Sequence, residues 1–338
     1  MRNGIENYLL KHWYSAHDPP WFLRMLEPVY RAAYRNAQNK QKAVFDDTRS
    51  SIPVVVVGNI TAGGSGKTPL VIALCQMARD LHLKVGIAST GYGRQSRATI
   101  LVQPDSDSKT CGDEPLLLAQ RCGVPVVVAV HRTEAVRTLE EMGIELVISD
   151  DGLQQADLKR ELEICVIDGS RGLGNGHLLP AGPLRESPDR LALVERVISN
   201  GSWAEKPGDL DVSLMTLEAM LIHSLDDTTV LTLSEFQQRH EDVAVHAVAA
   251  IGNPERFFKL LTRHGIDHIP HRFGDHHGYA KQDFSAMANA AAIVMTEKDA
   301  VKCRRLGLEN AWYVPVDALL TEEFQDWFKN KLLELTLH

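Results

Sequence analysis

Residues 58–70, GNITAGGSGKTPL, decide the fold. They follow the four consecutive valines of 54–57, a β-branched run typical of a buried strand. A strand, a glycine-rich turn and then Gly-Lys-Thr form the pattern of a phosphate-binding loop. The stretch therefore predicts a phosphate-binding α/β protein, and the rest of the chain must show which phosphate is held and where it goes.

The loop consensus G-x-x-x-x-G-K-[ST] covers residues 61–68, with Thr61 in place of the first glycine. Its glycines let backbone N–H groups point at phosphate oxygens. Lys67 is expected to reach the β- and γ-phosphates and Thr68 to bind Mg²⁺, while the helix begun by Pro69 turns its positive end to the anion. A glycine-rich turn without a ligand is the alternative. The expected nucleotide-binding residues are Thr61, Ala62, Gly63, Gly64, Ser65, Gly66, Lys67 and Thr68.

Downstream of this loop, strand-like apolar runs alternate with helical patterns such as 68–81 and 113–121. This alternation favours a parallel sheet covered by helices on both faces. A second, smaller α/β unit follows a polar, turn-rich stretch at 201–243, and its AIGNP (250–254) echoes VVGNI (56–60). The expected strands are 52–57, 84–89, 99–102, 124–130, 146–149 and 164–167.

The composition is that of a globular protein with no electrostatic attraction to nucleic acid. The 338 residues are 44% hydrophobic and carry a net charge of −8. The five cysteines include no C-x-x-C pair, so we expect neither a disulfide framework nor a zinc knuckle. There is no apolar run of about 18 residues and no signal-peptide core. These features indicate a protein of the cytosol.

The first 50 residues are different from the remainder, with a net charge of +3 and eight of the 21 aromatic residues. Apolar side chains recur at helical spacing over 18–44, after Asp18 and two prolines that suit a helix start, and Pro28 predicts a kink or a break. This stripe either packs on the protein's own core or lies on an anionic membrane surface or acyl-chain groove, and one helix has faces for both.

Two pairs of acids are candidates for metal and proton chemistry. Asp150 and Asp151 follow the apolar run 146–149, where phosphate-loop proteins carry an acid for Mg²⁺. Asp113 and Glu114 begin a helical pattern, and a kinase acting on an alcohol needs a group that accepts the hydroxyl proton. Helix capping is the alternative for both pairs.

The segment HRFGDHHGY (271–279) supplies a second candidate for the proton relay. Asp275, His276 and His277 lie there between turn glycines, and a histidine beside a carboxylate orients and tunes it. A solvated loop is the alternative, as is metal ligation, although the spacing matches no zinc pattern.

GLGNGHLLPAGPLRES (172–187) is the most distinctive string, and long ordered loops of this kind usually bind a ligand. Arg185 is expected to grip a phosphate and Glu186 to assist the metal or the substrate. Asn175 and His177 of the same loop are further candidates for substrate binding.

A phosphate-binding loop does not by itself separate kinases from switches. One ATPase subclass has a lysine where Ala62 stands, and the guanine motif N-K-x-D is matched only by TEKD (296–299), which lacks the asparagine. A membrane-docking ATPase or GTPase switch acting on a protein partner, and a kinase for a soluble small molecule, remain the alternatives.

Seven strings occur in order over roughly residues 10–330: VGNITAGGSGKTP, GYGR, GDEP, DDGLQ, GNGHLLPAGPLRE, DHHGY and TEKDAVK. Together they resemble one family, the tetraacyldisaccharide 4′-kinases, which are lipid A 4′-kinases of Gram-negative bacteria. Two positions depart from that pattern, Thr90 where arginine is expected and Gln155 where histidine is expected.

The resemblance implies transfer of the ATP γ-phosphate to the 4′-hydroxyl of tetraacyldisaccharide 1-phosphate, forming lipid IVA in lipopolysaccharide biosynthesis, with Mg²⁺. It implies two Rossmann-like lobes joined by a two-stranded linker, peripheral attachment to the cytoplasmic face of the inner membrane, and no obligate protein partner. By motif, the catalytic residues are Asp113, His276 and Lys67, and the metal ligands are Thr68, Asp150, Asp151 and Glu114.

Together these observations predict a P-loop α/β core with a second, smaller Rossmann-like lobe and an N-terminal amphipathic helical segment. The expected domains are a lipid-associating segment at 1–50, the kinase core at 51–200, a linker or crossing strands at 201–243, and a C-terminal α/β lobe at 244–338.

Overall fold

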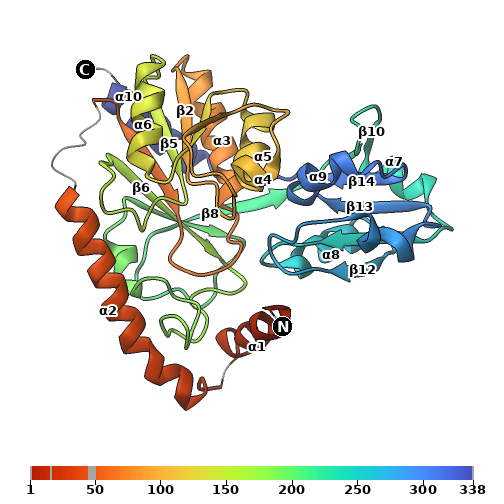
Figure 1. Cartoon of the computed structure of the whole chain (residues 1–338), viewed down its shortest axis with the longest axis horizontal. Coiled ribbons are helices and arrows are strands. Elements are labelled where there is room, and N and C mark those ends of the chain that lie inside the picture. Colours follow the sequence, from red (N-terminus) through yellow and green to blue (C-terminus); the bar gives the residue numbers. More distant parts are fainter. Residues whose placement is uncertain (1, 16, 45–50, 337–338) are drawn as a thin grey trace.

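The computed structural model describes the chain except for residues 1, 16, 45–50 and 337–338. Two sheets, each covered by helices, form a larger and a smaller lobe that lie side by side (Figure 1). The predicted mixed α/β class with a parallel core is confirmed.

The larger sheet has nine strands in the order β15-β8-β7-β6-β1-β5-β2-β4-β3, and its central strands are parallel. The phosphate-loop strand β1 lies between β5 and β6, so the loop that follows it opens at the carboxyl edge of the sheet. The strands are β1 (Val54–Gly58), β2 (Val85–Ser89), β3 (Ile100–Val102), β4 (Val126–Val128), β5 (Leu146–Asp150), β6 (Leu162–Asp168), β7 (Arg196–Asn200), β8 (Val212–Glu218) and β15 (Asp317–Leu320).

Side chains of β1 alternate between two cores because successive residues of a strand point to opposite faces. Val55 and Val57 pack with α3 and α5, whereas Val54 and Val56 pack with α6 on the other face. The helices of this lobe are α3 (Lys67–Asp80), α4 (Ser108–Cys111), α5 (Asp113–Cys122), α6 (Arg132–Glu141), α10 (Glu322–Thr336) and the 3₁₀ helix η2 (Pro188–Ala192).

The smaller sheet has six strands in the order β10-β9-β14-β13-β11-β12, parallel from β14 to β12 and antiparallel at β9 and β10. Its strands are β9 (Leu221–Ser224), β10 (Val230–Thr232), β11 (Val245–Ala249), β12 (Ile269–Arg272), β13 (Ala292–Thr296) and β14 (Ala311–Val314). Its helices are α7 (Leu233–Arg239), α8 (Pro254–Arg263) and α9 (Glu297–Cys303), with the 3₁₀ helices η3 (Lys281–Met287) and η4 (Arg304–Leu306).

The chain passes between the lobes along β8 and β15, which pair antiparallel at the edge of the larger sheet. Residues expected as linker are therefore shared, because β8 joins the larger sheet while β9, β10 and α7 join the smaller lobe. The chain end also differs from the expected lobe 244–338. Helix α10 returns to the larger lobe, where Phe324, Phe328 and Leu332 are buried in the core around α3.

Two helices form the N-terminal segment, α1 (Arg2–Trp13) and α2 (Trp21–Val44), and α2 runs along the outer edge of the larger lobe (Figure 1). The sequence did not predict α1. Pro28 does not break α2, because it lies on an exposed stretch where water can bond the carbonyl that the proline leaves free.

The apolar stripe of α2 divides along the helix. Its first half is exposed, with Trp21 73%, Met25 66% and Val29 64% accessible, while Tyr30 packs on the core and donates a hydrogen bond to the carbonyl oxygen of Arg185. Among the described residues, no helix has the length and apolar character needed to cross a membrane.

Candidate functional site

The phosphate loop begins at the end of β1 and opens into a cavity of about 1730 Å³ between the lobes, lined by Gly63 to Thr68. Gly66 has a φ of +97°, and a Cβ there would lie 2.3 Å from Asn200 Nδ2, so only glycine fits. Asn200 in turn donates a hydrogen bond to the carbonyl oxygen of Ser65. The end of β7 thus holds the loop in shape.

The backbone conformation of Thr61 shows why this loop needs no glycine at the first position of the consensus. Thr61 has no positive φ, and it forms an isolated antiparallel bridge with Leu184. Ala62 N–H donates to the carbonyl oxygen of Pro183 over 2.7 Å. The first two loop residues are therefore fixed against the chain at 183–184, and neither lines the cavity.

The two acids after β5 have different surroundings. Asp151 adopts a φ of +53° and pairs with both Lys67 (3.4 Å) and Arg185 (3.1 Å), and these charges hold its pKa below its usual range although burial opposes them. Asp150 is buried, and burial together with the charges of Glu114 and Asp151 raises its pKa to about 7. Its Oδ1 atom has no hydrogen-bond partner among the described residues.

Asp113 and His276 meet across the two lobes. Asp113 is the first residue of α5, and its Oδ2 atom lies 3.0 Å from Nδ1 of His276, a loop residue of the smaller lobe with a φ of +59°. Burial tends to raise the pKa of Asp113, but the hydrogen bond from His276 and the charge of Lys298 lower it below its usual range. Burial tends to lower the pKa of His276, but the hydrogen bond to Asp113 outweighs burial and raises that pKa above its usual value.

Lys298 was not predicted as a site residue, although its motif TEKDAVK carried the family resemblance. It projects from the first turn of α9, and its ammonium lies 2.8 Å from Glu114, 3.7 Å from Asp275 and 3.5 Å from Nε2 of His276. These carboxylates raise its pKa although burial opposes them. Lys298 therefore joins the two candidate proton-relay segments into one cluster.

Residues of the long loop at 172–187 have two different roles: some face the cavity, and others hold neighbouring segments in place. Arg185 lines the cavity, and Glu186 accepts a hydrogen bond from Gln154. Asn175 and His177 do not line it. The side chain of Asn175 bonds the carbonyl oxygens of His12 and Ala181, and His177 pairs with Glu27 of α2 over 3.0 Å, so the contacts of both fix the N-terminal helices.

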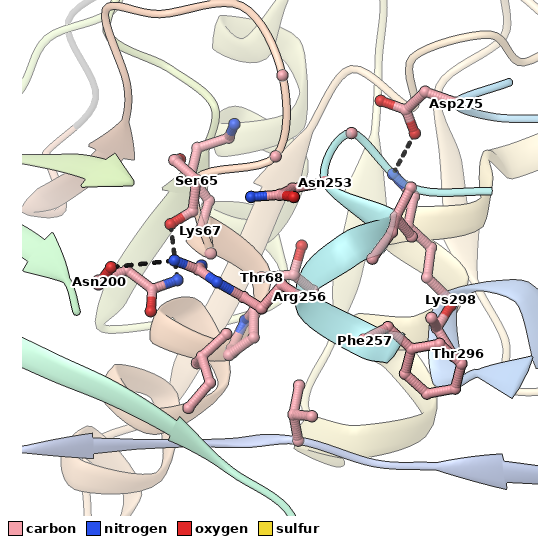
Figure 2. A pocket seen from close by; sticks show the side chains of 18 of the residues that line it. Ser65, Lys67, Thr68, Asn200, Asn253, Arg256, Phe257, Asp275, Thr296 and Lys298 are labelled. Atoms are coloured by element: carbon pink, nitrogen blue, oxygen red, sulfur yellow. Dashed lines mark hydrogen bonds and ion pairs between the residues drawn. The ribbon is translucent and has the colours of Figure 1, made fainter. Parts of the chain in front are cut away.

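The sequence patterns did not predict a second set of contacts between the lobes. Asp168, at the end of β6, accepts hydrogen bonds from Asn253 (3.1 Å) and Arg256 (2.8 Å) of the smaller lobe. Arg256 also reaches the carbonyl oxygen of Asn200 (Figure 2). The string AIGNP, which echoes VVGNI, was the sequence feature that could have indicated these contacts. Gly252 of that string lies against the backbone of Gly64. The two echoing loops face each other.

The cavity thus lies between two walls, and Figure 2 shows Ser65, Lys67 and Asn200 on one side and Lys298 with Asp275 on the other. An apolar part of the lining includes Pro69, Ile72, Leu217, Phe257, Leu260 and Val316. The predicted residues that line it are Gly63, Gly64, Ser65, Gly66, Lys67, Thr68, Glu114, Asp151, Arg185 and His276; the others, Thr61, Ala62, Asp113, Asp150, Asn175, His177 and Glu186, do not line it.

The residues fit a magnesium ion only together with a nucleotide. The described part of the chain has no cluster of three or more His, Cys, Asp or Glu residues that could hold a metal. Thr68 offers a hydroxyl at the cavity, and the unpartnered buried Oδ1 of Asp150 offers a carboxylate oxygen. Oxygen donors of this kind, completed by phosphate oxygens and water, are what Mg²⁺ takes. Asp151 and Glu114 are instead paired with cations.

Comparison with known proteins identifies the family of the chain. The family model described as tetraacyldisaccharide-1-P 4′-kinase matches residues 19–333. The chain belongs to this family. The tetraacyldisaccharide 4′-kinase of Azotobacter vinelandii is 43% identical over 340 residues, covering 98% of each chain, and that of Pseudomonas syringae pv. syringae is 40% identical, covering 98% of this chain and 99% of the relative.

A solved structure agrees at the level of the whole fold. LpxK from Aquifex aeolicus, described as an "apo" form in complex with ATP, superposes with a TM-score of 0.74 at 25% identity over 98% of this chain and 99% of that one. As a member of the family, the chain is an ATP-dependent lipid A kinase, a transferase that phosphorylates the 4′-hydroxyl of tetraacyldisaccharide 1-phosphate. The switch acting on a protein partner is not favoured.

Proposed function

We propose that the cleft between the lobes is where this phosphate transfer takes place, with Asp113 as the general base. The observation that carries the proposal is the pair of Asp113 and His276, which the fold brings together beside the cavity that Lys67 lines. A kinase must hold its alcohol next to the γ-phosphate and remove the hydroxyl proton there.

The electrostatics keep Asp113 ionised but also make it a weaker base, so its assignment as proton acceptor rests on its position beside the cavity. Its pKa lies below its usual range, so it is a carboxylate at neutral pH. Nδ1–H of His276 donates to it and fixes its orientation. The 4′-hydroxyl proton passes to a carboxylate oxygen of Asp113 while the hydroxyl oxygen bonds to the γ-phosphorus. The bond from phosphorus to the β–γ bridging oxygen breaks, and ADP leaves with that electron pair.

The phosphate loop would bind the triphosphate, with Lys67 along the β- and γ-phosphates and the N-terminus of α3 behind it. Thr68 and Asp150 would hold Mg²⁺, with Asp151 and Glu114 near it. When bound, Mg²⁺ neutralises charge on the phosphate oxygens. Arg185 and Glu186 would contact the disaccharide from the loop at 172–187, and the apolar lining suits the adenine ring.

The exposed half of α2 supports the proposed peripheral attachment to the cytoplasmic face of the inner membrane. Trp21, Met25 and Val29 present apolar surface, and Arg24, which has no ion pair among the described residues, supplies attraction of about 1 kcal/mol near an anionic lipid surface. The domain limit at residue 50 belongs to the same proposal, whereas the limits at 200 and 243 are revised because β8, β15 and α10 belong to the larger lobe. No obligate protein partner is part of it.

Purified protein with Mg-ATP and tetraacyldisaccharide 1-phosphate in detergent provides the test. Mass spectrometry should show the lipid gaining one phosphate, and Lys67→Ala should abolish the gain. Consumption of ATP without a phosphorylated lipid would contradict the proposed site.

A further inference from the structure

Arg171 is the feature of the cavity that the proposed mechanism leaves unused. It lies in the turn after β6, three residues after Asp168, the last residue of that strand, and it lines the cavity beside the phosphate loop. Its Nη1 atom lies 3.5 Å from the position that a Cβ on Gly63 would occupy. The guanidinium therefore borders the part of the loop whose backbone faces phosphate.

Arg171 differs in its partners from four other cations of the cleft, while Lys259 and Arg263, which also line it, are exposed on α8. Lys67 and Arg185 pair with Asp151, Arg256 pairs with Asp168, and Lys298 pairs with Glu114. An anion that approaches any of these must compete with a carboxylate that is already bonded. Arg171 forms no ion pair with any residue that the structure describes, and Asp168, three residues earlier, is bonded instead by Asn253 and Arg256.

Neutral groups hold the Arg171 guanidinium in place. Nη1 donates to the carbonyl oxygen of Gly252 over 2.8 Å, and the guanidinium carbon lies 4.8 Å from the centre of the Tyr14 ring. The Tyr14 hydroxyl bonds the carbonyl oxygen of Ala62, which ties that ring to the phosphate loop. No described carboxylate therefore pairs with the guanidinium, and it has further N–H donors in an orientation set by both lobes.

We propose that Arg171 is a phosphate-binding residue that contacts the γ-phosphate of ATP and thereby distinguishes ATP from ADP. The inference rests on the proposed placement of ATP at the phosphate loop. The 1-phosphate of the lipid offers the same chemistry, and the test separates the two sources. The γ-phosphate is favoured because Gly63, the neighbour of Arg171, belongs to the phosphate loop itself.

Nucleotide affinity gives the direct test. The dissociation constants of ADP and of the β,γ-imido analogue of ATP, each with Mg²⁺, are measured by calorimetry on the full chain. Arg171→Ala should weaken the ATP analogue about 10- to 100-fold, the loss expected for one charge-assisted hydrogen bond, and change ADP by less than about twofold. Arg171→Lys keeps the positive charge but lacks the planar, forked set of N–H donors of a guanidinium. It should recover part of the lost affinity for the ATP analogue.

Arg263→Ala is the matched control, because it removes the same charge from the exposed end of α8 at the cavity rim and should change both affinities by less than about twofold. Equal weakening of both nucleotides by Arg171→Ala would overturn the proposal, since it would mean that Arg171 only holds the lobes together. Unchanged affinities with a raised KM for the lipid, absent when the lipid lacks its 1-phosphate, would also overturn it.

Lys67→Ala separates this inference from the proposed function. It should weaken both nucleotides if ATP lies at the phosphate loop. If it weakened neither, the placement of ATP would fail. If Lys67→Ala weakened both and Arg171→Ala did not separate them, only the assignment of Arg171 would fail.

Discussion

Asp113 and His276 stand 163 residues apart in the chain and 3.0 Å apart in the structure, one on each lobe. His276 has a φ of +59°, which is uncommon for a residue other than glycine. Such positions persist only where the surrounding structure holds them. The proposed base is therefore complete only while the two lobes stay together.

Asp113→Asn tests the role of the carboxylate. The amide keeps the size of the side chain and loses its ability to accept a proton, so we expect kcat to fall about 10²- to 10⁴-fold while the dissociation constant of ATP changes little. Kinetics with the lipid substrate and calorimetry with ATP measure the two quantities. Weakened ATP binding with near-normal kcat would assign Asp113 a structural role.

The same pair predicts a pH-dependent stability. Because the pKa of His276 is raised in the folded protein, its full contribution to the free energy of unfolding is present below about pH 6.5. That contribution is lost as pH rises through the higher pKa of the folded state. Because the pKa of Asp113 is lowered in the folded protein, its full contribution to the free energy of unfolding is present above about pH 3.9. That contribution is lost as pH falls through the lower pKa of the folded state. His276→Gln should therefore destabilise most between about pH 4 and 6.5.

Urea denaturation of wild type and His276→Gln at pH 5.5 and 8.5 checks this difference. The gap in the free energy of unfolding should be smaller at the higher pH. In an Asp113→Asn background, the same substitution should lose its pH dependence, because the carboxylate partner is gone. A gap of equal size at both values would show that the ion pair does not stabilise the fold.

The phosphate-loop lobe was predictable because its signals are local. Four valines, a glycine turn and Lys67 specify a strand, a loop and a helix without reference to distant residues, and the observed β1 and α3 agree with them. The site acids were likewise placed next to recognisable turns. Asp113 begins α5 and Asp150 ends β5, as the patterns indicated.

What the sequence did not predict depends on contacts between distant segments. Arg171, Asp168 and Arg256 belong to no local motif, and their proximity follows only from the way the lobes meet. Helix α10 looked like part of the smaller lobe because it follows that lobe in the chain. Its apolar residues, among them Phe328, are buried against the larger one.

The exposed face of α2 predicts how the enzyme reaches its lipid. Replacing Trp21, Met25 and Val29 together by serine removes apolar surface that contributes roughly 25 cal/mol per Å² on burial. We expect binding to phosphatidylglycerol-containing vesicles in a flotation assay to fall about tenfold or more. The melting temperature should change little, because exposed side chains away from special features contribute little to stability.

Met220→Ser is the control for that experiment, because Met220 is 71% exposed on the smaller lobe. It should leave vesicle binding unchanged. If the triple variant bound vesicles as well as the wild type, α2 would not be the membrane-contacting surface.

Gly252→Ala tests whether the phosphate loop needs close contact with the smaller lobe. A Cβ on Gly252 would lie 2.3 Å from the backbone nitrogen of Gly64, a contact that side-chain rotation cannot relieve because both groups are close to the main chain. The smaller lobe must then shift away from the loop. Displacement of about 1 Å at a reacting centre costs about 10²-fold in rate, so we expect kcat to fall by that order.

Gly278→Ala is the matched substitution, since a Cβ there meets no atom within 4 Å and its backbone has no positive φ. It should retain near-normal kcat, and both variants should keep the wild-type circular dichroism spectrum. Wild-type kcat in Gly252→Ala would mean that the lobes act without direct contact at the loop. A loss of kcat restricted to Gly252→Ala would instead make the packing of Gly252 on Gly64 part of the catalytic geometry.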